Sequence, residues 1–182
     1  MTLADKFTSV RLILAPLFFI IYLFPVFFPS NGAMWTVIVL WVIFVLSEIT
    51  DLLDGIIARK MAEGSDFGKL YDPFADTLTQ ITYFLCFVID GILSPVLFLL
   101  VLYREFSVLF LRNLMLKKGI TLGARMSGKI KTVSYIVAAS LALLVTSGKR
   151  LGIQGDFNIW LSLAANVVFA LSVIIAVTSF IE

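Results

Sequence analysis

Residues 12–28 read LILAPLFFIIYLFPVFF, a run without a single charged side chain. A membrane-spanning helix needs about 20 mostly apolar residues, so this run with its flanks predicts a transmembrane helix. The residues before it, MTLADKFTSVR, form an amphipathic N-terminal lead-in to that helix. The run is long and aromatic, and no small-residue cleavage site of the A-x-A type follows it, so we do not interpret it as a secretory signal.

Five further apolar stretches follow, and turn-forming residues separate several of them. They run from about Met34 to Leu53, Leu70 to Ile89, Leu93 to Leu111, Ile130 to Thr146 and Ile159 to Ile181. The turn signals are PSNG at 29–32, DG at 90–91 and SG at 147–148. The sequence therefore predicts an all-α, polytopic membrane protein, a bundle of six transmembrane helices. We expect residues 1–182 to form a single membrane-embedded domain, without an appended soluble domain.

The composition of the whole chain agrees with a membrane protein and excludes several other classes. Hydrophobic residues make up 60% of the 182 residues, and only 14% are charged, against about a quarter in a soluble domain. A small soluble fold could not bury that much apolar surface. The net charge of +2 argues against nucleic acid as a partner. The single cysteine, Cys86, cannot form an internal disulfide, and its apolar surroundings predict a small core or lipid-facing residue.

Basic residues are distributed unequally between the two ends of the predicted helices. Lys149 and Arg150 lie on one side, and Arg104 lies inside a predicted helix. The remaining basic residues share the other side: Lys6, Arg11, Arg59, Lys60, Lys69, Arg112, Lys117, Lys118, Arg125, Lys129 and Lys131. By the positive-inside rule this side, with both termini, faces the cytoplasm. No Arg- and Ser-rich transit-like extension precedes the first helix, which favours a bacterial inner membrane.

Acidic residues occur at the ends of predicted membrane-spanning helices, where charged side chains are costly. Asp51 and Asp54 lie at the cytoplasmic end of the second predicted helix, and Asp72 and Asp76 at the start of the third. Spacings of three and four residues place each pair on one helix face, and a short connection makes the two helices antiparallel neighbours. Four facing carboxylates repel unless protons or a cation neutralise them, and oxygen ligands suit Mg²⁺, Mn²⁺ or Ca²⁺. Snorkelling of the acids to the lipid headgroups would account for one or two of them, but not for four in matched phase together with Glu48.

The absence of histidine restricts the chemistry that these acids can support. With no histidine in the chain, a Ser-His-Asp triad, a histidine base and histidine-ligated zinc or haem are all excluded. A carboxylate in a buried acidic cluster is the available substitute for a histidine base. Small residues accompany the acids at Gly55 and Ala58, where a ligand or a helix can approach closely. Gly68 precedes the third helix, where backbone N–H groups can receive a phosphate, and Arg59 can pair with a phosphate or with an aspartate.

The segment from Asp51 to Asp76 resembles the signature of the CDP-alcohol phosphatidyltransferase family, D-x2-D-G-x2-A-R-x8-G-x3-D-x3-D, at every fixed position. The resemblance implies a six-helix membrane enzyme, often a homodimer, that transfers a phosphatidyl group from a CDP-linked lipid to an alcohol and releases CMP. It further implies that one or two divalent metal ions are bound, and that Asp76 is the catalytic general base. The implied metal ligands are Asp51, Asp54, Asp72 and Asp76. The implied CDP-lipid-binding residues are Asp51, Asp54, Gly55, Ala58, Arg59 and Gly68.

The remaining basic residues bear on the acceptor alcohol. Arg104 lies inside the fourth predicted helix and either forms an ion pair with Glu48 or Glu105 or provides an anion site. Arg104 and Glu105 are about 100° apart on the helix, so they need not pair with each other. Lys131 either snorkels to lipid headgroups or belongs with the acceptor site. The predicted acceptor phosphate-binding residues are Arg104, Arg112, Arg125, Lys129 and Lys131.

Two short sequence motifs extend the resemblance to one subgroup of the family. YREFSVLFLR at 103–112 and SGKIKT at 127–132 are similar to the R-E-x6-R and G-K-x-K-T stretches of bacterial phosphatidylglycerolphosphate synthases. DKFTSVR at 5–11 resembles their N-x2-T-x2-R, with Asp5 in place of asparagine. Thr8 is thereby expected either to cap the helix or to line the CDP-lipid site, and Arg11 either to flank the membrane or to meet a phosphate.

This resemblance implies a reaction between CDP-diacylglycerol and sn-glycerol 3-phosphate that yields phosphatidylglycerol phosphate and CMP, with Mg²⁺ or Mn²⁺ as cofactor. Alternative acceptors are inositol phosphate, phosphatidylglycerol and serine. A divalent-cation transporter is the alternative from a different class, although its ion site should lie near mid-membrane. A non-catalytic scaffold would have no need of four aspartates in this pattern.

Overall fold

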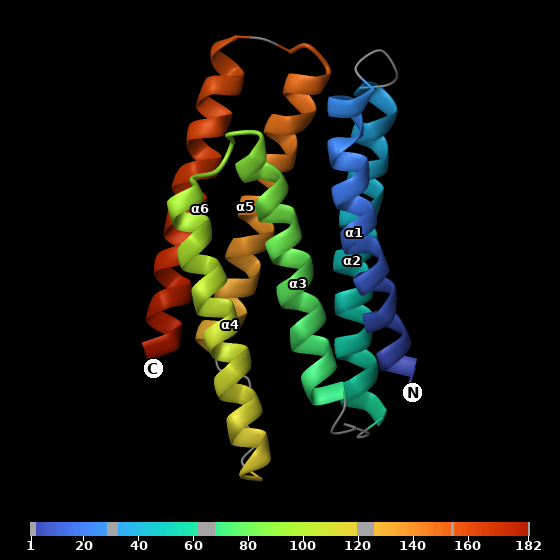
Figure 1. Cartoon of the computed structure of the whole chain (residues 1–182), viewed down its shortest axis with the longest axis vertical. Helices are drawn as coiled ribbons and strands as arrows, with labels where there is room; N and C mark the ends of the chain where they lie inside the picture. Colours follow the sequence, from blue (N-terminus) through green and yellow to red (C-terminus); the bar gives the residue numbers. More distant parts are fainter. Residues whose placement is uncertain (1–2, 29–32, 62–67, 120–125, 154, 182) are drawn as a thin grey trace. The chain divides into compact units, whose positions relative to one another are not determined.

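A computed structural model describes residues 3–28, 33–61, 68–119, 126–153 and 155–181; at 3–5, 33, 54–61, 69, 126–127 and 181 it describes the helix but not the side chains. Within these ranges the chain forms six α-helices and no strand, which confirms the predicted all-α fold (Figure 1). The helices are α1 (Leu3–Phe27), α2 (Ala33–Met61), α3 (Gly68–Ile89), α4 (Pro95–Lys117), α5 (Met126–Arg150) and α6 (Asp156–Ile181).

Most of the helices are longer than their apolar stretches. The amphipathic lead-in is continuous with the first helix, because α1 already begins at Leu3. Helix α2 continues past Leu53 to Met61, and α5 extends from Met126 to Arg150. Once a helix has formed, each further residue adds one hydrogen bond. The helix can therefore continue from an apolar run into the polar residues beside it. Helix α4 starts later than predicted, at Pro95, because proline suits the first turn of a helix and restrains the residue before it.

The surface of the helices identifies a membrane protein. Among the described residues, four helices are long and apolar enough to cross a bilayer, over Lys6–Phe27, Met34–Leu53, Gly128–Arg150 and Asp156–Phe180. Large apolar side chains on them point outward, as at Ile13, Ile38 and Trp160. Such surfaces are costly in water and compatible with lipid. Helices α3 and α4 fall outside this group because they carry charged residues, so their crossing of the bilayer stays a prediction.

The helices form two compact units, and the first comprises residues 1–83. Helices α1 and α2 pack against each other along their length and lie side by side in Figure 1. Tyr83 of α3 is buried against Phe18 of α1 and Phe44 of α2, with ring centroids 4.5 Å and 5.3 Å apart. Ala15 and Leu40 complete the buried surface between the helices. These aromatic contacts hold α3 against the α1–α2 pair and so place its acidic start in the same unit as Asp51.

The second unit comprises residues 84–182. Helix α5 packs against α6, and α4 also packs against α6. The close approach of α5 and α6 depends on small buried residues, such as Ala142 and Ala165. Phe84 fills the space between Tyr135 and Phe169, with ring centroids 5.2 Å and 4.8 Å apart. Cys86 is fully buried, so of the two predicted roles, core or lipid-facing, the structure shows the core.

Candidate active site

The first unit brings together three of the four predicted metal ligands. Helix α2 presents Asp51, and α3 presents Asp72 and Asp76 one turn apart. One carboxylate oxygen from each residue lies within 4.8 Å of the others. All three side chains are partly accessible, so the cluster is not sealed from ligands. Two consecutive helices, α2 and α3, thus converge on one acidic centre.

This donor set fits a hard divalent cation. Mg²⁺ binds oxygen ligands at about 2.1 Å, so oxygens on opposite sides of one ion lie about 4.2 Å apart. One carboxylate oxygen from each of the three aspartates lies within 4.8 Å of the others, so the three groups can converge on one ion. Carboxylate oxygens suit Mg²⁺ or Mn²⁺ better than softer metals, which prefer nitrogen or sulfur. The residues present can therefore hold such an ion.

The rest of the signature continues along α2. Asp54, Gly55, Ala58 and Arg59 all lie on this helix, which is unbroken to Met61, but their side chains lie outside the described part of the chain. Gly68 is the first residue of α3 and is half-buried. Gly68 lies one helical turn before Asp72. The first backbone N–H groups of α3, which have no partner within the helix, are therefore close in sequence to the cluster. The helix order of the signature therefore agrees with the prediction, while the contacts of these four side chains stay predictions.

A buried arginine lies among the three aspartates. The Arg11 side chain is only 2% exposed, and its Nη1 donates a hydrogen bond of 2.6 Å to Asp51 Oδ1. The same nitrogen donates to Asp76, and Nη2 donates to Asp72. The sequence left Arg11 between a membrane-flanking role and a phosphate contact. The structure instead makes it the counter-ion of the acidic cluster.

The spacing of residues along α1 could have predicted that Arg11 is buried. Arg11 lies three residues after Thr8 and four before Ala15, and all three are buried on the same face of α1. A charged residue on the buried face of an apolar helix requires an internal partner. Thr8, predicted to cap the helix or to line the CDP-lipid site, is 2% exposed and lies inside α1 rather than at its start. The neighbouring Ser9 forms a 3.0 Å hydrogen bond with Tyr71, which ties α1 to the start of α3.

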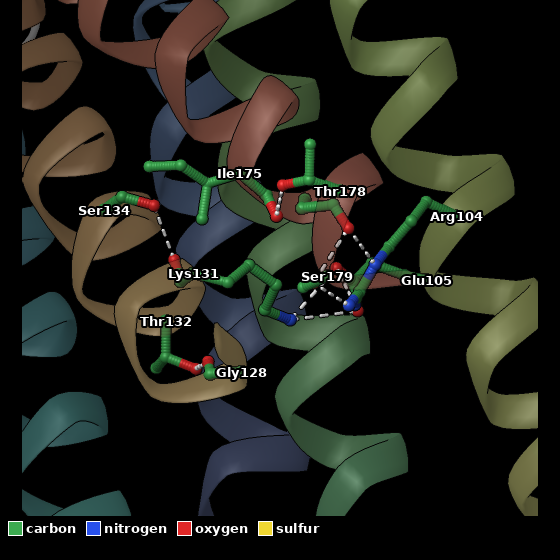
Figure 2. Close-up of polar contacts among 10 residues, drawn as sticks. Arg104, Glu105, Gly128, Lys131, Thr132, Ser134, Ile175, Thr178 and Ser179 are labelled. Atoms are coloured by element: carbon green, nitrogen blue, oxygen red, sulfur yellow. Dashed lines mark hydrogen bonds and ion pairs between the residues drawn. The ribbon is translucent and has the colours of Figure 1, made fainter. Parts of the chain in front are cut away.

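The second unit contains a separate charged cluster, built from the predicted acceptor residues. Arg104 Nη1 donates to Glu105 Oε1 at 2.9 Å, and Lys131 Nζ donates to both oxygens of Glu105 at 3.0 and 3.1 Å. Figure 2 shows the Arg104 and Lys131 side chains converging on this carboxylate from different helices. Glu105 is buried, so α4 and α5 share an internal ion pair.

Helix α6 completes the surroundings of Arg104. Arg104 Nη2 donates to Ser179 Oγ at 2.8 Å (Figure 2). Arg104 Nε donates to the Ala176 carbonyl oxygen at 3.0 Å. Lys131 also lies over the ring of Tyr135, with Nζ 5.0 Å from the ring centroid. Arg104 and Lys131 therefore link Glu105 of α4 to groups of α5 and α6.

Two alternatives from the sequence are decided here. Arg104 and Glu105 pair with each other, although their positions are about 100° apart on the helix. Of the two ion-pair partners considered for Arg104, the structure shows Glu105. Lys131 does not snorkel to the headgroups, because its amino group is buried on Glu105.

The other predicted acceptor residues do not join this cluster in the described part of the chain. Lys129 is exposed and lines a shallow depression on α5 with Ile130, Val133 and Ser134. Arg112 is half-buried near the end of α4. Arg125 lies outside the described residues. The structure thus unites Arg104 and Lys131, and the roles of the other three residues stay predictions.

Comparison with known proteins agrees with the signature. The sequence model of the family described as CDP-alcohol phosphatidyltransferase matches residues 1–178. The chain belongs to this family and is a transferase, as its resemblance predicted.

Several bacterial proteins are similar over most of their length. A CDP-diacylglycerol–glycerol-3-phosphate 3-phosphatidyltransferase of Treponema pallidum (strain Nichols) is 37% identical, over 99% of this chain and 86% of its own length. A protein of the same name from Bacillus subtilis (strain 168) is 33% identical, over 78% of this chain and 76% of its own. A Mycobacterium tuberculosis (strain H37Rv) protein named "Probable phosphatidylglycerophosphate synthase" is 30% identical, over 99% and 78%.

Proposed function

We propose that the protein transfers the phosphatidyl group of CDP-diacylglycerol to sn-glycerol 3-phosphate, yielding phosphatidylglycerol phosphate and CMP. The observation that carries the proposal is the convergence of Asp51, Asp72 and Asp76, three acids of the family signature, within 4.8 Å. The names of the relatives from Treponema pallidum and Bacillus subtilis support the choice of donor and acceptor.

The donor site is proposed to lie at the acidic cluster. Asp51, Asp72 and Asp76, together with Asp54, would hold one or two Mg²⁺ or Mn²⁺ ions. When bound, such ions neutralise the diphosphate of the donor and favour departure of CMP. The remaining signature residues and Thr8 would line the CDP-lipid site: Gly55, Ala58, Arg59 and Gly68.

Asp76 is proposed as the general base. The acceptor hydroxyl oxygen attacks the phosphorus that carries the diacylglycerol, and its proton passes to the Asp76 carboxylate. A bond forms between this oxygen and the phosphorus, and the bond from the phosphorus to the CMP oxygen breaks. General bases typically contribute 10²–10⁴-fold to a rate, and no histidine is present to take this role.

The acceptor phosphate is proposed to bind to the cationic residues of the second unit. Arg104 and Lys131 share one carboxylate, so the group of three carries one excess positive charge. Excess positive charge favours a phosphorylated acceptor over a neutral or zwitterionic one such as serine. Arg112, Arg125 and Lys129 would extend this site. Inositol phosphate and phosphatidylglycerol are the rival anionic acceptors.

A direct assay tests the reaction. Purified protein in detergent would receive CDP-diacylglycerol, Mg²⁺ or Mn²⁺, and one of glycerol 3-phosphate, inositol phosphate, phosphatidylglycerol or serine. We expect CMP release and a phosphatidylglycerol phosphate product with glycerol 3-phosphate alone. CMP release with a different acceptor would overturn the acceptor assignment but not the chemistry. Flux of divalent cations in proteoliposomes without any CMP release would favour a transporter instead.

The cellular setting is part of the same proposal. We infer a bacterial inner membrane, with the acidic cluster and both termini facing the cytoplasm, because basic residues concentrate on that side. We further infer a homodimer, as the family resemblance implies, in which residues 1–182 form one transferase domain. The family match over residues 1–178 supports the single domain.

A further inference from the structure

Arg11 lies where a divalent cation would have to bind. Its guanidinium contacts one carboxylate of each of Asp51, Asp72 and Asp76. The oxygens of these carboxylates that could bind an ion lie within 4.8 Å of one another. An ion about 2.1 Å from each oxygen would overlap nitrogen atoms already at hydrogen-bond distance from the same groups. The guanidinium and the ion therefore cannot both take the central position.

The negative charges of the three carboxylates explain why a cation occupies the cluster both with and without bound metal. Three ionised carboxylates in one cluster repel one another strongly, and this repulsion grows as water is excluded. Arginine keeps its charge under all ordinary conditions and presents several donors in a planar fork. A single guanidinium can therefore neutralise part of the cluster and hydrogen-bond all three acids at once. Its burial, at 2% exposure, is tolerable only because these partners are present.

We propose that Arg11 is the built-in counter-ion of the acidic cluster and competes with the divalent cation for the same three carboxylates. Metal binding exchanges with the guanidinium, so Arg11 lowers the affinity of the cluster for metal and stabilises the protein when metal is absent. This inference rests on the proposed function, because it takes the cluster as the metal site of the transferase. Arg11 is a positioning residue here, since it acts on the aspartates.

The sign of one measurement separates this role from a purely structural one. If Arg11 only held the three carboxylates together, its removal would let them move apart and would weaken metal binding. If Arg11 competes with the ion, its removal strengthens metal binding, although the metal-free protein becomes less stable. The two roles thus predict opposite changes in the dissociation constant for the metal.

The experiment uses the full-length protein in detergent, with Mn²⁺ alone and without any lipid substrate. Free Mn²⁺ is measured by electron paramagnetic resonance, and the Tm is measured in EDTA and in Mn²⁺. In Arg11→Gln we expect the Kd for Mn²⁺ to fall at least about tenfold, since hydrogen bonds between charged groups no longer compete. The Tm should fall in EDTA, and Mn²⁺ should raise it more than in the wild type. Lys6→Gln, an exposed site on the same helix, removes one positive charge and should change neither quantity.

A second variant keeps the test decisive if Arg11→Gln does not fold. Arg11→Lys retains the charge, but a single ammonium group cannot bridge three carboxylates with the same geometry, so its Kd for Mn²⁺ should lie below that of the wild type. An unchanged or higher Kd in the folded variant overturns the competition. If the wild type releases CMP with Mn²⁺, that result leaves the proposed function standing. If neither the wild type nor a variant binds Mn²⁺, both the metal site and the inference are wrong.

Discussion

Asp76 is proposed to have two roles that one side chain seldom combines, as a metal ligand and as a general base. It belongs to the acidic cluster, and it is proposed to receive a proton from the acceptor hydroxyl. Helix α3 allows both, because Asp72 lies one turn earlier on the same face and Asp51 faces it from α2. Arg11 hydrogen-bonds Asp76 as well, so the proton acceptor is already oriented within a network of charges.

At the residue scale, Asp76→Asn tests the base. We expect turnover to fall about 10²–10⁴-fold, because an amide cannot accept the proton. Binding of CDP-diacylglycerol should change much less, since three signature carboxylates remain. The measurement is CMP release alongside equilibrium binding of the donor. Asp156→Asn, an exposed site in the first turn of α6, is the matched control. Near-normal turnover in Asp76→Asn would refute the base role.

Arg104→Ala tests the acceptor site. Loss of a charge-assisted hydrogen bond costs about 1.5–3 kcal/mol, so we expect the KM for glycerol 3-phosphate to rise roughly 10–100-fold. The KM for CDP-diacylglycerol should stay within about twofold of the wild-type value. Lys129→Ala provides a comparison within the predicted set, because Lys129 is exposed and outside the Glu105 cluster. An unchanged acceptor KM in Arg104→Ala would leave this arginine with a structural role alone.

At the scale of the helices, Glu105 joins three of them through two cations. Lys131 reaches it from α5, and Arg104 links the carboxylate to Ser179 of α6. Glu105→Gln would leave two largely enclosed cations with an uncharged partner. Breaking a buried ion pair typically costs about 3–5 kcal/mol, so thermal unfolding in detergent should show a clearly lower Tm. Glu105→Asp keeps the charge and should lose less; equal Tm values for Glu105→Gln and the wild type would contradict the internal pair.

The helices also show which structural features local sequence patterns can predict. The six apolar stretches locate the helices, because helix formation depends on residues close in sequence. Their ends are less predictable, since Leu3–Arg11 and the segment from Asp54 to Met61 continue helices into polar sequence. The sequence left Arg104 with Glu48 or Glu105 as a partner, because wheel angles describe where side chains start rather than how far a long side chain reaches.

At the scale of the whole molecule, the distribution of basic residues predicts an orientation. Single cysteines would replace Lys118 and Ile153, two exposed residues, in a Cys86→Ala background. In intact spheroplasts, a membrane-impermeant maleimide should label the cysteine at position 153 and leave that at position 118 unlabelled. Permeabilised spheroplasts, in which both sites should react, are the control. The reverse labelling pattern would place the termini and the acidic cluster outside the cytoplasm.

Composition and short-range spacing were enough to predict the membrane class, the six helices and the acids that approach one another, and the resemblance to a family signature predicted the family. The tertiary structure decided which cation meets which acid. Arg11 lies 40 residues from Asp51 and 65 from Asp76, and Lys131 lies 26 from Glu105. No local pattern specifies such pairs, because they depend on how separate helices rotate and pack. The physical reason is that a buried charge needs a partner, while only the packed fold determines which partner is within reach.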